Sequence, residues 1–190
     1  MALFVYVDYS NVWIEGMRVS AVRKGLAADI HGAMNDHVTD QSWRLDFGRL
    51  YQAICPEDAQ IGRSSLFGSR PPDNDSLWEM ARRQGFEVEV FDRNFRNKEK
   101  EVDVAIATQM MADSYEYMSA DRNDRVVLLS GDRDYLPTLR SLVSRGFPTT
   151  VVFWSHGLSH DLREFADDFF ELDGIFDAIS HAGSMRESTA

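Results

Sequence analysis

Short apolar runs alternate along the chain with longer stretches in which apolar residues recur at helical spacing. "LFVYV" at 3–7 is a continuous apolar run and predicts a buried strand, whereas "FEVEVFD" at 86–92 alternates, as in a strand with one covered face. Further strands are predicted at 61–69, 125–130 and 148–154, and helices at 12–24, 46–55, 77–85, 101–118 and 133–146. Strands that alternate with helices predict an α/β fold with a mostly parallel central sheet and helices on both faces.

Chain length and turn residues indicate the domain organisation. A chain of 190 residues can bury its own core and predicts a single domain at 1–180. The polar segment 25–42 is expected to be an irregular insertion, and the tail 183–190 is expected to be mobile. Gly85 and Gly146 are expected to end two of the predicted helices.

Composition narrows the class of protein. The hydrophobic fraction of 44% is typical of a globular chain. The single cysteine, Cys55, excludes an internal disulfide framework and disfavours a cysteine-ligated zinc site. The N-terminus has no basic cluster before its apolar run, unlike a signal peptide, and no apolar run is long enough to span a membrane. We therefore expect a soluble, cytoplasmic protein without a membrane partner, and the oligomeric state stays open, with a homodimer among the alternatives.

The net charge of −11, from 20 basic and 31 acidic residues, disfavours a nucleic-acid partner if taken alone, because phosphates are bound by Lys and Arg. Carboxylates that bind a divalent ion count as negative in this sum, however, and the basic residues are clustered. The segment "DRNFRNKEKEVD" contains Arg93, Arg96, Lys98 and Lys100. The field near a site can differ in sign from the total, so these four residues are candidate RNA contacts, with a solvated loop as the alternative.

Acidic side chains follow two of the predicted strands. Asp8 ends the first strand and precedes Asn11, and Asp132 and Asp134 come directly after the strand at 125–130. In open parallel sheets, ligands bind outside the carboxyl ends of the strands, so these side chains converge if the two strands are neighbours. Asp103, in the first turn of the helix at 101–118, is a further candidate. Hard cations such as Mg²⁺ take oxygen ligands and keep several waters, so a few carboxylates suffice for a metal site.

Four segments, in this order, resemble the blocks of the NYN domain, a branch of the PIN-like ribonucleases. They read "FVYVDYSNV", "KEVDVAIATQMM", "VVLLSGDRDYLPTL" and "SHDLREFADDFFELD". The resemblance spans roughly Leu3 to Asp173, apart from the segment 25–42. It implies a Rossmann-like, PIN-like three-layer fold and metal-dependent hydrolysis of RNA phosphodiester bonds, with Mg²⁺ or Mn²⁺ as cofactor and single-stranded or structured RNA as partner.

The resemblance also implies roles for five candidate catalytic residues. Asp8, Asp103 and Asp132 match the metal-binding carboxylates, and Asn11 and Asp134 match residues that support them. In such a site the ion lowers the pKa of a water molecule, which attacks the phosphorus, so no protein nucleophile is needed. Each residue also has an alternative role that is purely structural. Asp8 and Asp132 could cap helices, Asp103 and Asp134 could favour a helix N-terminus through its dipole, and Asn11 could close a turn.

Two positions depart from the family pattern. Tyr9 stands where the first block usually has glycine, and Gln109 stands where the helix block usually has another aspartate. They keep open a second hypothesis, a catalytically weak NYN-like domain that acts as an RNA- or protein-binding scaffold. Tyr9 could stack on an unpaired base, although packing under the following loop is preferred. A haloacid-dehalogenase-like phosphatase fits poorly, because it needs an acid where this chain has Ser10.

Other polar residues are expected to have structural roles. Asp113, Asp167 and Asp168 are predicted to lie on solvated faces. His156 and His160 fall in a predicted loop and at a helix start, and their spacing suggests no Ser–His–Asp or Cys–His arrangement. The candidate chemistry therefore rests on carboxylates.

Overall fold

A computed structural model describes the protein at residues 1–69, 75–91 and 98–182, the side chains of 98–100 excepted; the tail 183–190 therefore lies outside the described residues. Within this part of the chain, six strands form one sheet in the order β3-β2-β1-β4-β5-β6, and every neighbouring pair is parallel. The strands are β1 (Ala2–Asp8), β2 (Gln60–Ser69), β3 (Glu87–Phe91), β4 (Arg125–Leu129), β5 (Thr149–Phe153) and β6 (Asp168–Glu171). The predicted parallel α/β sheet is confirmed.

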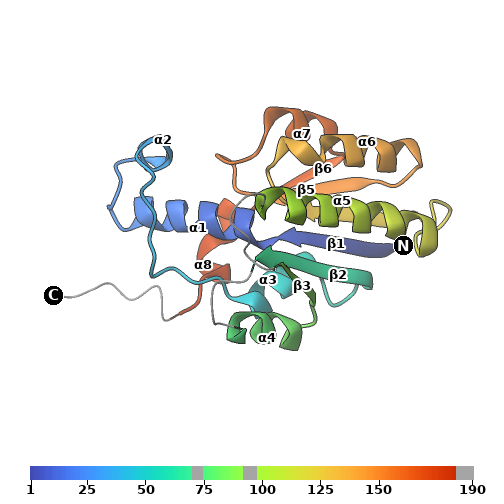
Figure 1. The fold of residues 1–190 in the computed structure, drawn as a ribbon, viewed down its shortest axis with the longest axis horizontal. Coiled ribbons are helices and arrows are strands. Elements are labelled where there is room, and N and C mark those ends of the chain that lie inside the picture. The colour runs from blue at the N-terminus through green and yellow to red at the C-terminus, as the bar shows by residue number, and fades with distance from the viewer. Residues whose placement is uncertain (70–74, 92–97, 183–190) are drawn as a thin grey trace.

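Helices cover both faces of this sheet (Figure 1). They are α1 (Tyr9–Arg23), α2 (Ile30–Asn35), α3 (Phe47–Ile54), α4 (Ser76–Arg83), α5 (Lys98–Glu116), α6 (Leu136–Ser144), α7 (His160–Phe165) and α8 (Phe176–Ile179), with 3-10 turns η1 (Arg133–Tyr135) and η2 (Leu172–Ile175). One core cluster joins the sheet to α5, α6 and α7, and the other joins it to α1, α3, α4 and α8. None of the described helices combines the length and the apolar character needed to cross a lipid bilayer.

Strand β1 lies in the middle of the sheet and is buried on both faces, which accounts for its continuous apolar sequence. Phe4 and Tyr6 belong to the core under α5, and Val5 and Val7 belong to the core under α1 and α3. Because side chains alternate along a strand, Asp8 falls on the same face as Tyr6. The last residue of the strand is therefore directed toward α5.

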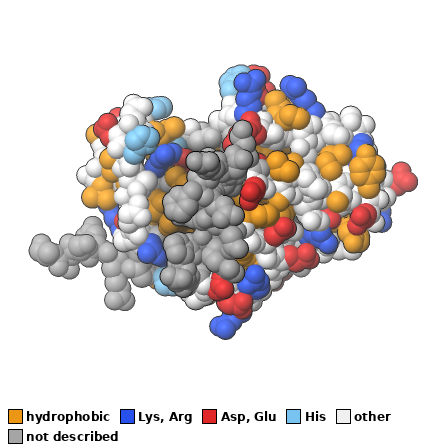
Figure 2. All heavy atoms as spheres, viewed as in Figure 1, with side chains coloured by type: hydrophobic (Ala, Val, Ile, Leu, Met, Phe, Trp, Pro, Cys, Tyr) orange, Lys and Arg blue, Asp and Glu red, His pale blue; other side chains and the backbone are white. Residues whose placement is uncertain are grey.

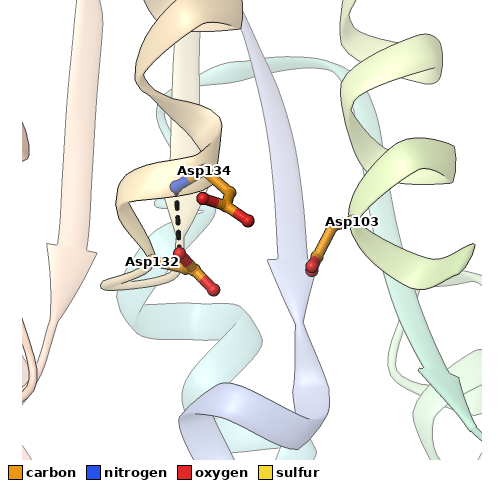
Figure 3. A group of neighbouring side chains, drawn as sticks. All are labelled: Asp103, Asp132 and Asp134. Atoms are coloured by element: carbon orange, nitrogen blue, oxygen red, sulfur yellow. Dashed lines mark hydrogen bonds between the residues drawn. The ribbon is translucent and has the colours of Figure 1, made fainter. Parts of the chain in front are cut away.

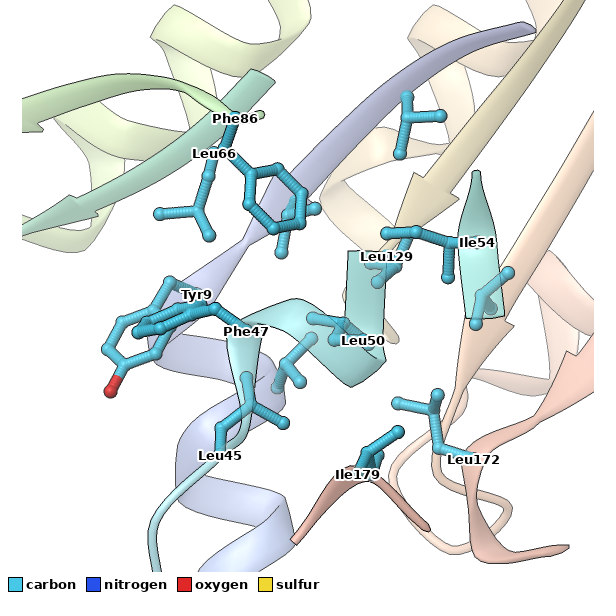
Figure 4. Packing of buried hydrophobic residues seen from close by; sticks show 14 of the residues in the cluster. Tyr9, Leu45, Phe47, Leu50, Ile54, Leu66, Phe86, Leu129, Leu172 and Ile179 are labelled. Carbon is cyan, nitrogen blue, oxygen red and sulfur yellow. The ribbon is translucent and has the colours of Figure 1, made fainter. Parts of the chain in front are cut away.

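The core under α1 is rich in aromatic rings and contains Tyr9 (Figure 4). Its ring lies 5.9 Å from the Trp13 ring in a stacked arrangement, 5.6 Å from Phe47, and 5.2 Å from Trp78, edge to face. Only 6% of Tyr9 is exposed. These contacts support the preferred interpretation of Tyr9 as a packing residue and leave no open ring face for a base.

The strand order reverses between β1 and β4. From β1 the chain builds β2 and β3 on one side of the sheet, and then returns to build β4, β5 and β6 on the other. At such a switch point the loops after the two central strands diverge, and a crevice opens at their carboxyl ends. Asp8 ends β1, and Asp132 and Asp134 follow β4. The condition for these acids to converge is met, because β1 pairs with β4.

Several elements differ from the expectations. Helix α1 begins at Tyr9, three residues earlier than predicted, because the side chain of Asp8 caps it. The segment 25–42 is not wholly irregular, since it contains α2, and an Asp40 carboxylate that accepts from Ser20 Oγ at 2.6 Å ties it to α1. Strand β6 and the helices α7 and α8 complete the fold beyond the predicted strand at 148–154. Gly85 and Gly146, with φ of +110° and +84°, follow α4 and α6 as expected.

Candidate metal centre at the switch point

Asp8 is buried at the carboxyl end of β1, with 5% of its surface exposed. One carboxylate oxygen, Oδ1, accepts a hydrogen bond from the Asn11 N–H at 3.1 Å, and Oδ2 accepts one from the Tyr135 hydroxyl at 3.3 Å. Burial raises the pKa of Asp8 to about 7; the Asn11 N–H opposes the rise, and the negative charge of Asp103 adds to it. Asp8 therefore both caps α1 and is a buried acid with a raised pKa.

Three further carboxylates meet beside this strand end (Figure 3). Asp103 comes from the first turns of α5, Asp132 from the loop after β4, and Asp134 from η1. One oxygen of each lies within 4.8 Å of an oxygen of the other two. Asp132 also accepts a hydrogen bond from the Asp134 N–H at 2.9 Å, which caps η1. Like charges at this separation repel, so a bound cation would stabilise the cluster.

Tyr135 connects the two groups of acids. Its side chain is 1% exposed, and its hydroxyl lies 2.9 Å from Asp103 Oδ1 and 3.3 Å from Asp8 Oδ2. Burial, together with the charges of both carboxylates, raises the pKa of Tyr135 above its usual range. Sequence reasoning missed this residue, although a tyrosine directly after two candidate acids offered a signal.

Asn11 fixes the loop that carries Asp132. Its side-chain oxygen Oδ1 accepts a hydrogen bond from the Gly131 N–H at 3.3 Å, which links the start of α1 to the residue before Asp132. Gly131 has no room for a side chain, because a Cβ there would lie 2.3 Å from the carbonyl oxygen of Gly157. The amide and the glycine together hold the loop close against α1 and the loop after β5.

One helical turn beyond Asn11, a second polar group joins the same elements. Glu15 of α1 contacts His156 Nε2 of the loop after β5 at 2.8 Å, and its other oxygen pairs with Arg18. Burial would raise the pKa of Glu15, but the hydrogen bonds from His156 and Arg18 outweigh it and lower the pKa. His156 thus has a structural partner on α1.

The resemblance of four sequence segments to the NYN domain is confirmed, since the family model of the NYN domain matches residues 3–173. The chain belongs to the NYN family. This family lies within the PIN-like nuclease superfamily, whose members use divalent metals, as the resemblance of the four sequence blocks implied.

A solved structure has the same fold as this NYN domain. It is VPA0982, a protein of unknown function from Vibrio parahaemolyticus, with a TM-score of 0.67 and 18% sequence identity over 95% of this chain and 96% of that chain. At this identity the similarity shows the fold alone. No curated protein has a matching sequence.

Gln109 of α5, where the family usually has an aspartate, has a structural role in this NYN domain. Gln109 donates a hydrogen bond at 2.8 Å to Asp113, which also accepts from Tyr6 Oη at 2.7 Å and from Arg63 Nη1 at 2.9 Å. Asp113 is completely buried, so its predicted place on a solvated face is wrong. Polar and apolar residues are not clearly separated onto two sides of α5, so the sequence did not indicate that Asp113 faces the sheet. Asp167, in contrast, is exposed, as predicted.

The basic residues proposed for RNA contact cannot be placed beside the carboxylates. Arg93 and Arg96 lie outside the described residues, and of Lys98 and Lys100 only the helical backbone of α5 is described. Their contact with RNA stays a prediction.

A cavity of about 270 Å³ opens between α5 and the strands β2 and β3 of the NYN domain. Phe67, which pairs with Asp8 in the parallel register, lines it together with Arg63 and Gln109. The carboxylates of Glu87 and Glu89 also line it, so this cavity is poorly suited to a phosphate.

Proposed function

We propose that this NYN domain is a ribonuclease that hydrolyses RNA phosphodiester bonds with Mg²⁺ or Mn²⁺ held by carboxylates at the switch point. The observation that carries the proposal is the meeting of Asp103, Asp132 and Asp134 within 4.8 Å. Asp8 joins this group through the Tyr135 hydroxyl. Family membership supports the same reaction, because the family belongs to a nuclease superfamily.

The set of donors fits a hard divalent cation. Oxygen ligands lie about 2.0–2.6 Å from Mg²⁺ or Ca²⁺, so two ligands of one ion are up to about 5 Å apart, which the 4.8 Å cluster satisfies. Carboxylates are also the ligands that suit Mg²⁺ and Mn²⁺, rather than softer metals. Asp103, Asp132 and Asp134 satisfy this distance and would hold the ion; Asp8, which the family resemblance implies as a ligand, is not one of these three and is connected to them through Tyr135.

The chain's own residues arrange the site in three ways. The bound ion would supply a positive charge for the phosphate and would acidify a water molecule. Asn11 and Gly131 hold the loop that carries Asp132, and the cap on α1 holds Asp8. Burial of Asp8 keeps solvent from one side of the cluster and so strengthens charge interactions there.

Surface charge makes RNA binding depend on the metal. On the face shown in Figure 2, the described Lys and Arg side chains are interspersed with Asp and Glu and form no continuous basic stripe. The net charge of −11 repels a polyanion at long range. We therefore expect RNA affinity to fall when the divalent ion is removed, in addition to the loss of cleavage.

A scaffold is the second candidate function, and one observation favours it. Where the family usually has another aspartate, Gln109 donates its amide to the buried Asp113 and so adds no charge to the cluster. A domain with fewer acidic ligands binds metal more weakly and could retain RNA or protein binding without turnover.

An RNA cleavage assay separates the two functions. The parent protein should cleave single-stranded or hairpin RNA with Mn²⁺ or Mg²⁺ and stop in chelator. Asp103→Asn and Asp132→Asn should each lower the rate by about 100-fold or more, because even partners outside the ligand set change activity by about 10–100-fold. The double variant should be little worse than either single one, since the ligands act as a unit.

Asp46→Asn is the matched control for these variants. Asp46 caps α3 by accepting from the Arg49 N–H at 3.1 Å, and so repeats the capping chemistry away from the cluster. Cleavage that persists in chelator, or in the Asp132→Asn variant, contradicts the metal-dependent mechanism. Binding of RNA by a parent protein that never cleaves it supports the scaffold.

A further inference from the structure

A single phenol lies between carboxylates from two different elements. Tyr135 belongs to η1, Asp103 to α5, and Asp8 to the end of β1. The hydroxyl lies 2.9 Å from Asp103 and 3.3 Å from Asp8, and the tyrosine is 1% exposed. Water therefore has little access to this hydroxyl, and the two carboxylates are its neighbours.

The geometry ranks the two contacts. A hydroxyl has one hydrogen to donate, and the shorter distance makes Asp103 its main acceptor. Asp8 is also held by the Asn11 N–H, at 3.1 Å. The hydroxyl thus orients Asp103 with respect to β1, and it keeps two carboxylates of like charge at a fixed separation.

We propose that Tyr135 is a positioning residue that sets the orientation of Asp103 and Asp8 for metal binding. The proposal rests on the metal-dependent function proposed above. Side chains that hydrogen-bond to metal ligands typically change metal affinity by about 10–100-fold when they are replaced, because they fix the ligand before the ion arrives. Phenylalanine at this position retains the ring and its packing and removes the hydroxyl alone.

Tyr6 of β1 offers a closely matched control, because its hydroxyl also donates to an aspartate of α5. Its hydroxyl donates to Asp113 of α5 at 2.7 Å, and its side chain is 0% exposed. Tyr6→Phe therefore removes a buried tyrosine–aspartate hydrogen bond of the same kind. Asp113 lies far along α5 from Asp103, so this change should lower stability without changing the metal site.

The test is a titration of the full chain with Mn²⁺ in the absence of RNA. Electron paramagnetic resonance of free Mn²⁺ measures how much of the ion is bound. Tyr135→Phe should weaken Mn²⁺ binding by about tenfold or more, while Tyr6→Phe binds like the parent. Thermal unfolding in chelator reports folding of both variants independently of the metal. In the cleavage assay, Tyr135→Phe should need about tenfold more Mn²⁺ for half-maximal rate and reach a similar rate at saturation.

The outcomes separate this inference from the proposed function. Equal Mn²⁺ affinity of Tyr135→Phe and the parent overturns the positioning role, whatever the parent does to RNA. A parent that binds Mn²⁺ without cleaving RNA refutes the ribonuclease, and the Mn²⁺ affinities still decide the role of Tyr135. A parent that binds no Mn²⁺ overturns both. Equal losses of affinity in Tyr135→Phe and Tyr6→Phe, with equal losses of stability, reduce Tyr135 to a packing role.

Discussion

Replacing Asp8 by asparagine is expected to stabilise the metal-free protein at neutral pH and above. Asp8 is 5% exposed, and burial is the largest cause that raises its pKa from 3.8 to about 7. The folded protein therefore holds a charged carboxylate in an environment that favours the neutral acid. Asparagine has the same size and carries no charge.

The magnitude follows from the difference between the two pKa values. One pKa unit corresponds to about 1.4 kcal/mol, so the ionised Asp8 costs the folded state about 4 kcal/mol. Asparagine caps a helix about as well as aspartate, so its oxygen still accepts from the Asn11 N–H. Its amide can donate to the Tyr135 hydroxyl, which donates to Asp103. Because neutral hydrogen bonds are weaker, we expect a net gain of about 2–4 kcal/mol.

The gain depends on pH in a defined direction. The unfolded chain loses the Asp8 proton near 3.8 and the folded chain near 7, so between these values the folded state binds more protons. The parent therefore loses stability relative to Asp8→Asn as the pH rises from about 4 to 7, and the difference stays constant above pH 7. Below about pH 4, where both forms are neutral at this position, the difference vanishes.

Urea unfolding in chelator at pH 5 and pH 8 measures this difference, and Asp46→Asn reports the effect of the same change at the cap of α3. Saturating Mn²⁺ should then stabilise the parent more than Asp8→Asn. Binding to the folded state adds more stability the higher the affinity, and the parent retains the Asp8 carboxylate that the variant lacks. A difference between the parent and Asp8→Asn that is the same at both pH values contradicts the raised pKa. A variant that is less stable than the parent at pH 8 contradicts the cost of burying the charge.

Two further changes probe the surroundings of the site. Arg63→Ala removes one partner of the completely buried Asp113, and urea unfolding should show a loss of about 2–3 kcal/mol, below the value for a fully buried pair because Arg63 is partly exposed. Gly131→Ala places a Cβ 2.3 Å from the Gly157 carbonyl oxygen and should displace the loop that carries Asp132. The expected result is Mn²⁺ binding weakened by about tenfold, and unchanged binding would show that this loop can adjust.

The fold and the meeting point of the acids could be predicted, because both follow from local patterns. Apolar runs and helical spacing identify β1 and β4, and parallel strands place Asp8 and Asp132 at one edge once those strands are neighbours. Strand β6 was missed for a physical reason. Its four residues, "DFFE", are largely exposed at the edge of the sheet and carry no alternation long enough to recognise.

The contacts that organise the site could not be predicted from pattern. Asp113 accepts a hydrogen bond from an arginine 50 residues earlier in the chain, and Tyr135 contacts Asp8, 127 residues earlier. Such pairs depend on how α5 packs against β1 and β2. Helix α5 offers no clear polar face from which that packing could be read, since Asp103 and Asp113 both lie among apolar residues.

Capping a helix and binding a metal are compatible roles for Asp8. The Asn11 N–H binds Oδ1 and the Tyr135 hydroxyl binds Oδ2, so capping holds the carboxylate in place while burial keeps it at a pKa of about 7. A cap alone needs no burial, because the caps of α2 and α3 accept the same type of hydrogen bond near the surface. The burial of Asp8 therefore destabilises the metal-free fold and is not needed for capping. Local rules of stability are broken in this way where a residue serves binding or catalysis.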